Sequence, residues 1–384
     1  MRILQIHNSY LFGGGEDRMV QVEAAALREV GDEVIVAHTS NPRTVGAQIR
    51  TFATAPWNVA SARTIESLID RSHPDVAHVH NTWYRFSPSI VSALRRRRVP
   101  VVMTVHNYRL MCANALFFRD GAPCTDCLGS HPWRAAVHRC YRDSTVESVV
   151  AASTISINRS FSTWERGVDR FVVATRFAGD LLSDAGFPGE RIRIVPPMIP
   201  DPGLRVQAPS SSSTVVYVGR IEEGKGLEML FEAWRRVSPE FELVVVGEGP
   251  LRPSLEDLRV PRTRFLGWVD SPQVDEILLS SRALVFPSQF FETFGLSAGE
   301  SLAAGLPVVA GSIGTRREVL GEDGAGWLVD TNTVEDWTRT LGELMNDDAV
   351  DKAGVVARAR YEERFAPAVA LDVLRGVYEE TLGG

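Results

Sequence analysis

The stretch from Phe291 to Glu300, FETFGLSAGE, lies between two apolar runs, ALVFPS before it and LAAGLPVVA after it. Short runs rich in Val, Leu and Ala next to Gly and Pro are typical of buried strands in a parallel sheet. The residues after Gly295 have the pattern of a helix, so the segment predicts a strand, a loop, a helix and a second strand. Glu292 then stands in the loop, Glu300 stands inside the helix, and both carboxylates can face one ligand at the helix N-terminus. The alternative is one acid in a first turn and one solvated acid on the helix.

The same alternation of strand-like runs and helical segments recurs along the chain. The second half also contains TVVYVGRI, ELVVVGEGP, TRFLGWV, LPVVAG and GWLVD, and the first half contains RILQIHN, DEVIVAH, DVAHVH, VPVVMTVHN, FVVATRF and IRIVPP. Helical patterns lie between them, such as Met19, Glu23, Leu27 and Val30, which stop at Gly31. This alternation indicates βαβ units, so the sequence predicts an α/β protein with parallel sheets in two Rossmann-like domains.

The domain boundary is predicted from composition. The segment PPMIPDPGLRVQAPSSSS, residues 196–213, is rich in Pro and Ser and is typical of a linker. It separates a first domain, residues 1–195, from a second domain, residues 214–366. A last helix, residues 367–384, can pack on either domain. Ligands of such folds bind beyond the carboxyl ends of the strands, so we expect a ligand in a cleft that both sheets border.

Composition narrows the class of protein. The chain has 384 residues, of which 44% are hydrophobic and 23% are charged, as in ordinary globular domains. The net charge of −7 is spread along the chain and argues against a nucleic-acid binder, because such domains usually carry a basic patch. The N-terminal run is soon broken by polar residues, and no uncharged apolar run reaches the roughly 18 residues of a membrane span. We therefore expect a cytoplasmic location.

Two glycine-rich segments follow strands and can hold an anion. GGGEDR, Gly13 to Arg18, opens a helix after the first strand, where the helix N-terminus favours negative charge. VGRIEEGKG places Arg220 and Lys225 ahead of a helix in the second half. A planar guanidinium and a compact ammonium beside free N–H groups suit a diphosphate. A tight turn for the first segment, and surface charge around a glycine turn for the second, are the alternatives.

Together these motifs resemble the retaining, nucleotide-sugar-dependent glycosyltransferases of family 4, and the resemblance covers nearly the whole chain. Its specific part is a Glu, seven residues and a second Glu, here ETFGLSAGE, followed by SLAAGLPVV and later GTRREVL. The upstream Gly-Arg…Lys-Gly segment is the second matching element, in the expected order. The resemblance implies the GT-B fold, in which two Rossmann-like domains face each other across a cleft. It also implies a donor sugar nucleotide held mostly by the second domain.

The functional positions of the family carry over residue by residue. The resemblance implies that Arg220 and Lys225 bind the diphosphate, that Glu292 bonds hydroxyls of the donor sugar and that Glu300 bonds the ribose. It also implies that His106, in VHNYR, lies beside the donor sugar, although a satisfied histidine at a strand end is the alternative. His106 and Glu292 are thus the candidate catalytic residues. Further donor contacts, largely through the backbone, are implied at Gly14, Gly15, Gly247, Val269, Phe294, Gly295 and Leu296.

The expected reaction moves a hexose from a UDP- or GDP-linked donor to a hydroxyl of a glycan, a lipid-linked saccharide or a natural product, with retention at the anomeric carbon. No catalytic metal is expected, because Arg, Lys and the helix dipole neutralise the leaving diphosphate. Glu292 is expected as a sugar ligand, so front-face attack with leaving-group assistance is the favoured hypothesis. An epimerase or a phosphorylase on the same fold is the alternative enzyme. A non-catalytic, zinc-stabilised binding protein is the alternative of another class.

All the cysteines fall in one loop-rich insert, residues 107–142, with the spacing C-x(11)-C-x(2)-C-x(12)-C. A C-x-x-C pair with two further thiols suits tetrahedral zinc, and a cytosolic setting disfavours disulfides. The sequence therefore predicts a structural zinc site with the ligands Cys112, Cys124, Cys127 and Cys140. Either His131 or His138 can replace one ligand, and four reduced thiols or a redox pair within the C-x-x-C are the alternatives. Because the insert begins close after His106, we expect the zinc-held loop to shape the acceptor pocket.

Two segments bear on a membrane contact. The run RRRR, Arg95–Arg98, ends a helical stretch, where cations are favourable, and docking on anionic lipid at the inner membrane face is the alternative. The segment SVVAASTISINRSFSTW, residues 148–164, has mixed apolar spacing that a lipid-facing helix would also show. The partners expected from the sequence are a sugar nucleotide and an acceptor, without nucleic acid.

Overall fold

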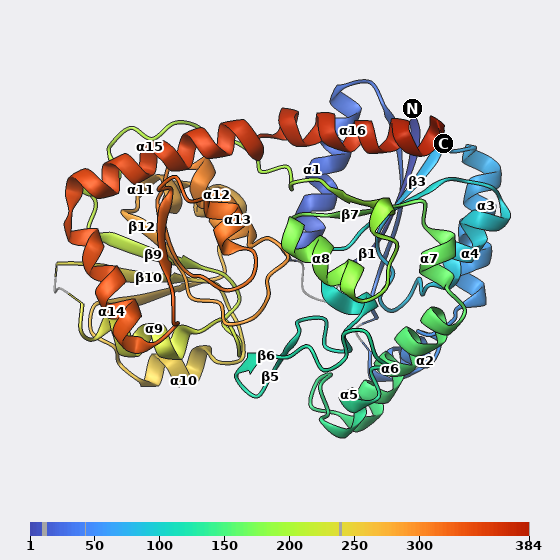
Figure 1. Cartoon of the computed structure of the whole chain (residues 1–384), viewed down its shortest axis with the longest axis horizontal. Coiled ribbons are helices and arrows are strands. Elements are labelled where there is room, and N and C mark those ends of the chain that lie inside the picture. The colour runs from blue at the N-terminus through green and yellow to red at the C-terminus, as the bar shows by residue number, and fades with distance from the viewer. Residues whose placement is uncertain (10–13, 43, 238–239, 384) are drawn as a thin grey trace. The chain divides into compact units, whose positions relative to one another are not determined.

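The structure is a computed structural model that describes residues 1–9, 14–42, 44–237 and 240–383. The chain forms two compact units. Unit 1 consists of Met1–Phe117, Cys124–Met198 and Ala370–Gly384, and unit 2 consists of Phe118–Pro123 and Ile199–Val369. Each unit contains a six-stranded sheet whose strands are all parallel, with helices packed on it (Figure 1). The predicted α/β fold with two Rossmann-like domains is therefore confirmed.

The strands of unit 1 are the six apolar runs that the sequence predicts. They are β1 (Arg2–Ser9), β2 (Glu33–Ser40), β3 (Val76–Asn81), β4 (Val101–Thr104), β7 (Arg170–Val173) and β8 (Ile192–Ile194), in the spatial order β2-β1-β3-β4-β7-β8. Ile3 of β1 is in register with both Val34 of β2 and Val76 of β3, so β1 is paired with a strand along each of its two edges. Residues of β3 are buried along its whole length, as expected of a strand inside a parallel sheet.

The helices of unit 1 alternate with these strands, belong to the insert or lie at the C-terminus. They are α1 (Gly15–Glu29), α2 (Val45–Ala53), α3 (Val59–Ser72), α4 (Ser89–Arg96), α5 (Arg134–Val137), α6 (Thr145–Ser160), α7 (Thr163–Gly167), α8 (Arg176–Asp184) and α16 (Pro367–Gly383). The C-terminal helix α16 contributes Leu374 and Tyr378 to one core cluster with Ile3, Leu27 and Val76. Burying a side chain such as leucine is worth about 1.5–3 kcal/mol, so α16 is an integral part of unit 1.

Unit 2 repeats the architecture with its own sheet and helices. Its strands are β9 (Thr214–Val218), β10 (Glu242–Val246), β11 (Thr263–Gly267), β12 (Ala283–Phe286), β13 (Val308–Gly311) and β14 (Gly326–Val329), in the spatial order β11-β10-β9-β12-β13-β14. Its helices are α9 (Leu227–Trp234), α10 (Arg252–Asp257), α11 (Ser271–Ser280), α12 (Leu296–Ala303), α13 (Arg316–Leu320), α14 (Val334–Gly342) and α15 (Asp347–Arg364). Trp234 and Trp337 are fully buried at the centre of its core.

The cysteine-containing insert has little regular structure. It holds α5 and a two-stranded antiparallel hairpin, β5 (Phe118–Arg119) and β6 (Ala122–Pro123). This hairpin groups with unit 2, where the Phe118 ring lies 6.1 Å from the ring of Phe290. The hairpin was not predicted, because a strand of two residues is too short to show a period.

Candidate functional site

Two loops of unit 2 that carry predicted ligand-binding residues lie next to each other. One follows β9 and the other follows β12, which are adjacent strands reached by chain connections running in opposite directions. Ligands of open parallel sheets commonly bind beyond the strand ends at such a point. The backbone N–H of Gln289 donates to the backbone carbonyl of Gly224 at 2.7 Å and connects the two loops. A Cβ at Gly226, where φ is +74°, would lie 2.1 Å from the carbonyl oxygen of Pro287, so this approach requires glycine.

Lys225 and Glu292 form an ion pair between these loops. The Nζ of Lys225 lies 2.8 Å from Oε1 of Glu292, and the side chains are only 16% and 15% exposed. Ser288 donates its hydroxyl to the same oxygen at 2.7 Å. Burial raises the pKa of Glu292, but the charges of Lys225 and Arg316 outweigh it, so this pKa lies below its ordinary value. Lys225, the residue predicted to bind the diphosphate, and Glu292, the residue predicted to bind the sugar, are thus in direct contact. The sequence did not reveal this contact.

Arg220 lies in the same loop as Lys225 but in a different environment. Its side chain is 71% exposed, and Nη2 lies 2.8 Å from Oε1 of Glu222. Its backbone is fixed by the hydroxyl of Tyr217, which donates to the Arg220 carbonyl at 2.7 Å. An exposed ion pair contributes little to stability, so the guanidinium can exchange Glu222 for another anion at low cost.

The start of α12 offers backbone donors beside this ion pair. Gly295 has a φ of +92° and precedes the first helical residue, Leu296, without a side-chain cap. A Cβ at Gly295 would lie 2.8 Å from the ring of Phe286, so the turn requires glycine for two reasons. Uncapped N–H groups at a helix start favour an anion or hydroxyl oxygens. Phe294 is buried before this turn, and Glu300 is half-buried in the second turn of the helix.

The remaining predicted residues of unit 2 lie beyond the ends of β10 and β11. Gly247 follows β10 with a φ of +137°, and a Cβ there would lie 1.9 Å from the carbonyl oxygen of Gly219. Val269 follows β11 and is half-buried, beside Trp268, which is exposed. Because all strands of the sheet are parallel, these positions share the edge that carries the loops after β9 and β12.

In unit 1, His106 follows β4 and lines a cavity of about 50 Å³ together with His80, Thr104 and Arg109. The Nε2 of His106 lies 3.0 Å from Nδ1 of His80. Burial and the neighbouring His80 hold the pKa of His106 well below its ordinary value, because both disfavour the imidazolium.

The glycine-rich segment of unit 1 starts α1. Gly14 caps the helix with an extended backbone, and its N–H donates to the Asp17 carboxylate at 3.0 Å, while Gly15 is the first helical residue. Both are exposed, and a Cβ at Gly14 would meet no described atom within 4 Å. Packing among the described residues therefore does not demand glycine at this position. Gly13 of the predicted motif lies outside the described residues.

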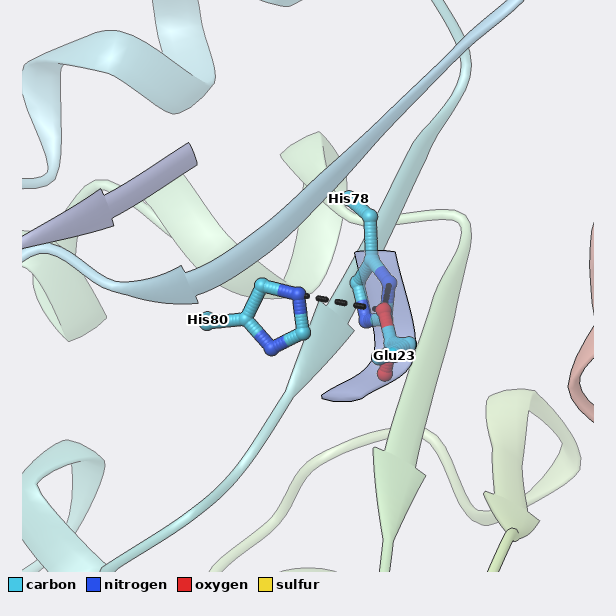
Figure 2. A group of neighbouring side chains, drawn as sticks. All are labelled: Glu23, His78 and His80. Atoms are coloured by element: carbon cyan, nitrogen blue, oxygen red, sulfur yellow. Dashed lines mark ion pairs between the residues drawn. The ribbon is translucent and has the colours of Figure 1, made fainter. Parts of the chain in front are cut away.

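Sequence reasoning missed a cluster of buried ionisable groups in unit 1 (Figure 2). Oε1 of Glu23, from α1, lies 2.8 Å from Nδ1 of His78 and 3.3 Å from Nε2 of His80. The alternation in DVAHVH was the available signal, because residues two apart on a strand face the same side. Sequence reasoning also did not single out Glu16, at the start of α1. Burial and the neighbouring charge of Asp17 raise the pKa of Glu16 to about 8.

The four cysteines lie near one another in unit 1. Cys112 and Cys127 are buried, Cys124 and Cys140 are half-buried, and these four cysteines are not linked by disulfides. Burial, together with the three other thiols, raises the pKa of Cys127 to about 12. Within the described ranges, however, three potential ligand atoms come within 4.8 Å of one another only at Glu23, His78 and His80. The sulfur atoms are thus more widely spread than a metal would hold them, and His131 and His138 are exposed.

The arginine run is largely neutralised by neighbouring acids. Arg95 pairs with Asp169, Arg96 with Glu66 and Arg97 with Asp70, at 3.2, 2.8 and 2.8 Å. Among the residues that the structure describes, every helix is too short or too polar to cross a membrane.

Two family models match the chain side by side. The model described as Glycosyltransferase Family 4 matches residues 13–201, and the model described as Glycosyl transferases group 1 matches residues 205–362. The sulfoquinovosyl transferase of Arabidopsis thaliana is 26% identical over 368 residues, which cover 88% of this chain and 66% of that protein. The phosphatidyl-myo-inositol mannosyltransferase of Mycolicibacterium smegmatis is 32% identical over 183 residues, 46% of this chain and 47% of that protein. The aligned segment of this chain thus spans about half to two thirds of the length of these curated relatives.

Solved structures of the same fold cover the whole chain. Anabaena HepE in complex with UDP and glucose superposes with a TM-score of 0.71 at 15% identity, over 99% of this chain and 100% of that chain. The sucrose-phosphate synthase of Thermosynechococcus elongatus superposes with a TM-score of 0.73 at 16% identity, over 100% and 99%. At sequence identities of 15% and 16%, these superpositions show that the fold is shared.

Proposed function

Because the chain belongs to the family 4 type of glycosyltransferases and has the GT-B fold, we propose that it transfers a sugar from a nucleoside-diphosphate donor to an acceptor hydroxyl with retention. UDP is the first donor nucleotide to test, since it is bound in HepE, and GDP is the second. The proposed acceptor is a glycan, a lipid-linked saccharide or a small-molecule hydroxyl.

The observation that carries this proposal is the Lys225–Glu292 ion pair, where the loops after the adjacent strands β9 and β12 meet. A diphosphate oxygen can share the Lys225 ammonium with Glu292, because an ammonium carries three donors. The carboxylate is ionised, so it only accepts hydrogen bonds and suits the hydroxyls of a sugar. One loop pair therefore has a cation for the leaving group and an anion for the transferred group.

We assign the remaining roles from position and chemistry. Arg220 and the uncapped start of α12, at Phe294, Gly295 and Leu296, would receive the rest of the diphosphate. Glu300 would bond the ribose, and Gly247 and Val269 would border the base. In unit 1, His106 would contact the donor sugar, and Gly14 and Gly15 would contact the diphosphate.

The proposed step needs no group beyond donor and acceptor. The bond between the anomeric carbon and the diphosphate oxygen breaks, and the acceptor oxygen bonds to the same face of that carbon. The acceptor proton passes to the departing phosphate oxygen. Stabilising the charge that develops on the diphosphate lowers the barrier, and removing one such donor typically costs about 100- to 1,000-fold in rate.

The test is a transfer assay with UDP- and GDP-hexoses and a panel of acceptors, with the anomeric configuration of the product read by proton NMR. We expect Glu292→Ala and Lys225→Ala to lose transfer while keeping the fold, measured by circular dichroism. Full turnover by either variant would refute the donor-site assignment, and an inverted product would refute retention. A glycosyl adduct trapped on Glu292 would replace front-face attack with a covalent mechanism. Donor conversion without acceptor would indicate an epimerase, and dependence on inorganic phosphate would indicate a phosphorylase.

Two further predictions concern unit 1. The proximity of Cys112, Cys124 and Cys140 to Cys127 supports a structural zinc site with these four cysteines as ligands. Zinc binding would have to draw the sulfur atoms inward. Peripheral contact with an anionic membrane would have to displace the carboxylates that pair with Arg95, Arg96 and Arg97.

A further inference from the structure

Helix α1 places a carboxylate where its apolar pattern predicts a hydrophobic side chain. Glu23 lies between Met19 and Leu27 on the side of α1 that packs in the core of unit 1. The carboxylate meets two imidazoles of strand β3, which point to the same side because they are two residues apart. These are His78 and His80, whose ring centroids lie 4.0 Å apart (Figure 2). A charge buried in this way needs partners or a metal ion.

One nitrogen of each histidine, called here the inner nitrogen, faces Glu23. Oε1 of Glu23 lies 2.8 Å from Nδ1 of His78 and 3.3 Å from Nε2 of His80. Burial raises the pKa of Glu23, but the two histidines outweigh it, so this pKa lies well below its ordinary value and the carboxylate carries its charge. The three residues each offer one ligand atom, and these atoms all lie within 4.8 Å of one another. The cluster thus has the size and the chemistry of a cation site.

Hydrogen bonds alone do not account for Nε2 of His80. This nitrogen is buried and has no hydrogen-bond partner in the part of the chain that the structure describes. If Nε2 carried hydrogen, it would be a buried donor without an acceptor. If it did not, its lone pair would face a carboxylate oxygen 3.3 Å away. A cation between the two atoms removes this conflict, because it binds the lone pair and the carboxylate together.

The other nitrogen of each histidine contacts a group that can accept its hydrogen. Nε2 of His78 lies 2.7 Å from the hydroxyl oxygen of Thr104, and Nδ1 of His80 lies 3.0 Å from Nε2 of His106. Histidines that bind a metal almost always donate the second ring N–H to such a neighbour, which fixes the tautomer. In that tautomer the inner nitrogens of both histidines keep their lone pairs for the metal.

We propose that Glu23, His78 and His80 bind a divalent transition-metal ion, with zinc as the first candidate, and that this ion holds α1 to β3. Two imidazoles and one carboxylate are a known ligand set for zinc, whereas magnesium and calcium prefer oxygen ligands. The hydroxyl oxygen of Tyr378, in α16, lies 2.6 Å from Nδ1 of His78 and is the nearest candidate for a fourth ligand. The inference concerns unit 1 alone and does not depend on the proposed function.

The distances within the cluster are compatible with zinc after modest shifts of the side chains. Nitrogen and oxygen ligands lie about 2.0–2.1 Å from zinc in a tetrahedral site, so they are about 3.3 Å from one another. The distance of 3.3 Å from Glu23 to His80 fits, and the distance of 2.8 Å from Glu23 to His78 would widen by about half an ångström. The cavity of about 50 Å³ that His80 lines offers the ion a route to the cluster.

A cluster held by hydrogen bonds without a metal is the alternative. Gln5 donates to Oε1 of Glu23 at 3.1 Å, so the carboxylate and His78 have partners without an ion. Asp17 is a further carboxylate nearby, since it pairs with His7 at 2.7 Å and the His7 ring lies 6.3 Å from that of His80. The two interpretations differ in whether the protein retains a metal with nitrogen and oxygen ligands.

The measurement is X-ray absorption at the zinc edge on the full chain, freed of metal by dialysis against a chelator and reloaded with zinc chloride. The metal-free protein is the reference for every comparison and for any titration of His80. We expect zinc that survives gel filtration in metal-free buffer, with nitrogen and oxygen ligands at about 2.0–2.1 Å. Zinc at the cysteines would add sulfur ligands at about 2.3 Å, so one spectrum separates the two sites. Zinc bound by sulfur alone, or no retained zinc, would overturn the proposal.

Variants assign the ligands. Glu23→Gln keeps the shape of the side chain and removes its charge, and His80→Gln removes an imidazole. We expect each to lose the nitrogen and oxygen ligands and to lower the zinc affinity, measured by titration calorimetry, by more than about 100-fold, since loss of an outer partner alone typically costs about 10- to 100-fold. Thr104→Val removes such an outer partner of His78 and should show that smaller loss. The matched control is His38→Gln, which removes an exposed imidazole of the same sheet.

Thermal unfolding gives a second measurement on the same variants. Zinc should raise the Tm of the wild type and of His38→Gln by more than that of Glu23→Gln, because an ion stabilises only a protein that binds it. Equal loss of zinc in His38→Gln and His80→Gln would show adventitious binding to surface histidines and overturn the proposal. Should the Glu23 and His80 variants not fold, the wild-type spectrum and Thr104→Val decide. A nitrogen and oxygen shell whose affinity falls in Thr104→Val supports the site, and an unchanged affinity overturns it.

Discussion

Replacing Lys225 by methionine removes one partner of the buried ion pair in unit 2 and keeps the length of the side chain. Removing one member of a buried pair costs about 3–5 kcal/mol, because the other charge is left without its partner. At Glu292 the hydroxyl of Ser288 and the nearby charge of Arg316 remain, so we expect the lower end, about 3 kcal/mol. One kcal/mol shifts the Tm of a domain of this size by about 2–4 °C, so the unfolding of unit 2 should move down by about 6–12 °C.

The assay is thermal unfolding by calorimetry with a double-mutant cycle. Glu292→Gln is expected to cost less than Lys225→Met, because the Lys225 ammonium can regain water more easily than the carboxylate can. The double variant Lys225→Met/Glu292→Gln should cost less than the sum of the two single variants, and the difference measures the pair. Arg220→Met is the matched control, since it removes a cation from the same loop whose side chain is 71% exposed and should cost no more than about 1 kcal/mol. Equal Tm values for Lys225→Met and Arg220→Met, or additive costs in the cycle, would refute a buried pair.

Three further predictions concern pH, nucleotide binding and metal. Burial lowers the pKa of His80 in the folded protein to about 4, whereas the pKa of a histidine in the unfolded chain is about 6.5. Between these pH values the unfolded chain binds a proton that the folded chain does not bind. The free energy of unfolding should therefore be highest above about pH 6.5 and fall by up to about 3 kcal/mol as the pH drops to 4. Urea unfolding of wild type and His80→Gln across that range measures it, and identical slopes would contradict it. UDP or GDP at 100 times its dissociation constant should add about 2.7 kcal/mol to folding and raise the Tm, and a panel in which neither shifts the Tm would count against the donor proposal. Cys124→Ser should lose zinc and stability together, and unchanged zinc content with an unchanged Tm would remove this cysteine as a ligand.

The sequence was most informative where the physics is local. All twelve strands of the two parallel sheets were predicted, since a strand buried on both faces needs an unbroken apolar run. Gly226 and Gly295 stood out as turns before helices, and the structure shows that a Cβ would clash at both. A periodic pattern of a few residues is enough to indicate such elements.

The sequence was least informative where distant residues meet. His78 and Tyr378 lie 300 positions apart, and Lys225 and Glu292 lie 67 apart, so no local pattern links either pair. The cysteines illustrate the same limit, because their spacing in the sequence predicts zinc ligands but does not determine how far apart the sulfur atoms lie in the described structure. The spacing of ligands limits which residues can meet, and the loops between them decide whether they do.

The assignment of the last helix to unit 1 has a consequence for biosynthesis. The core of this unit needs Leu374, Val377 and Tyr378 of α16, which are made after the whole of unit 2. Domains usually fold in the order in which the ribosome makes them. Here the N-terminal unit keeps part of its apolar surface uncovered until α16 has been made, by which time unit 2 can already have formed its own core. We therefore expect the nascent N-terminal unit to expose apolar surface of the kind that chaperones bind. A stop codon just before Ala370 should yield a folded second unit joined to a first unit that lacks part of its core.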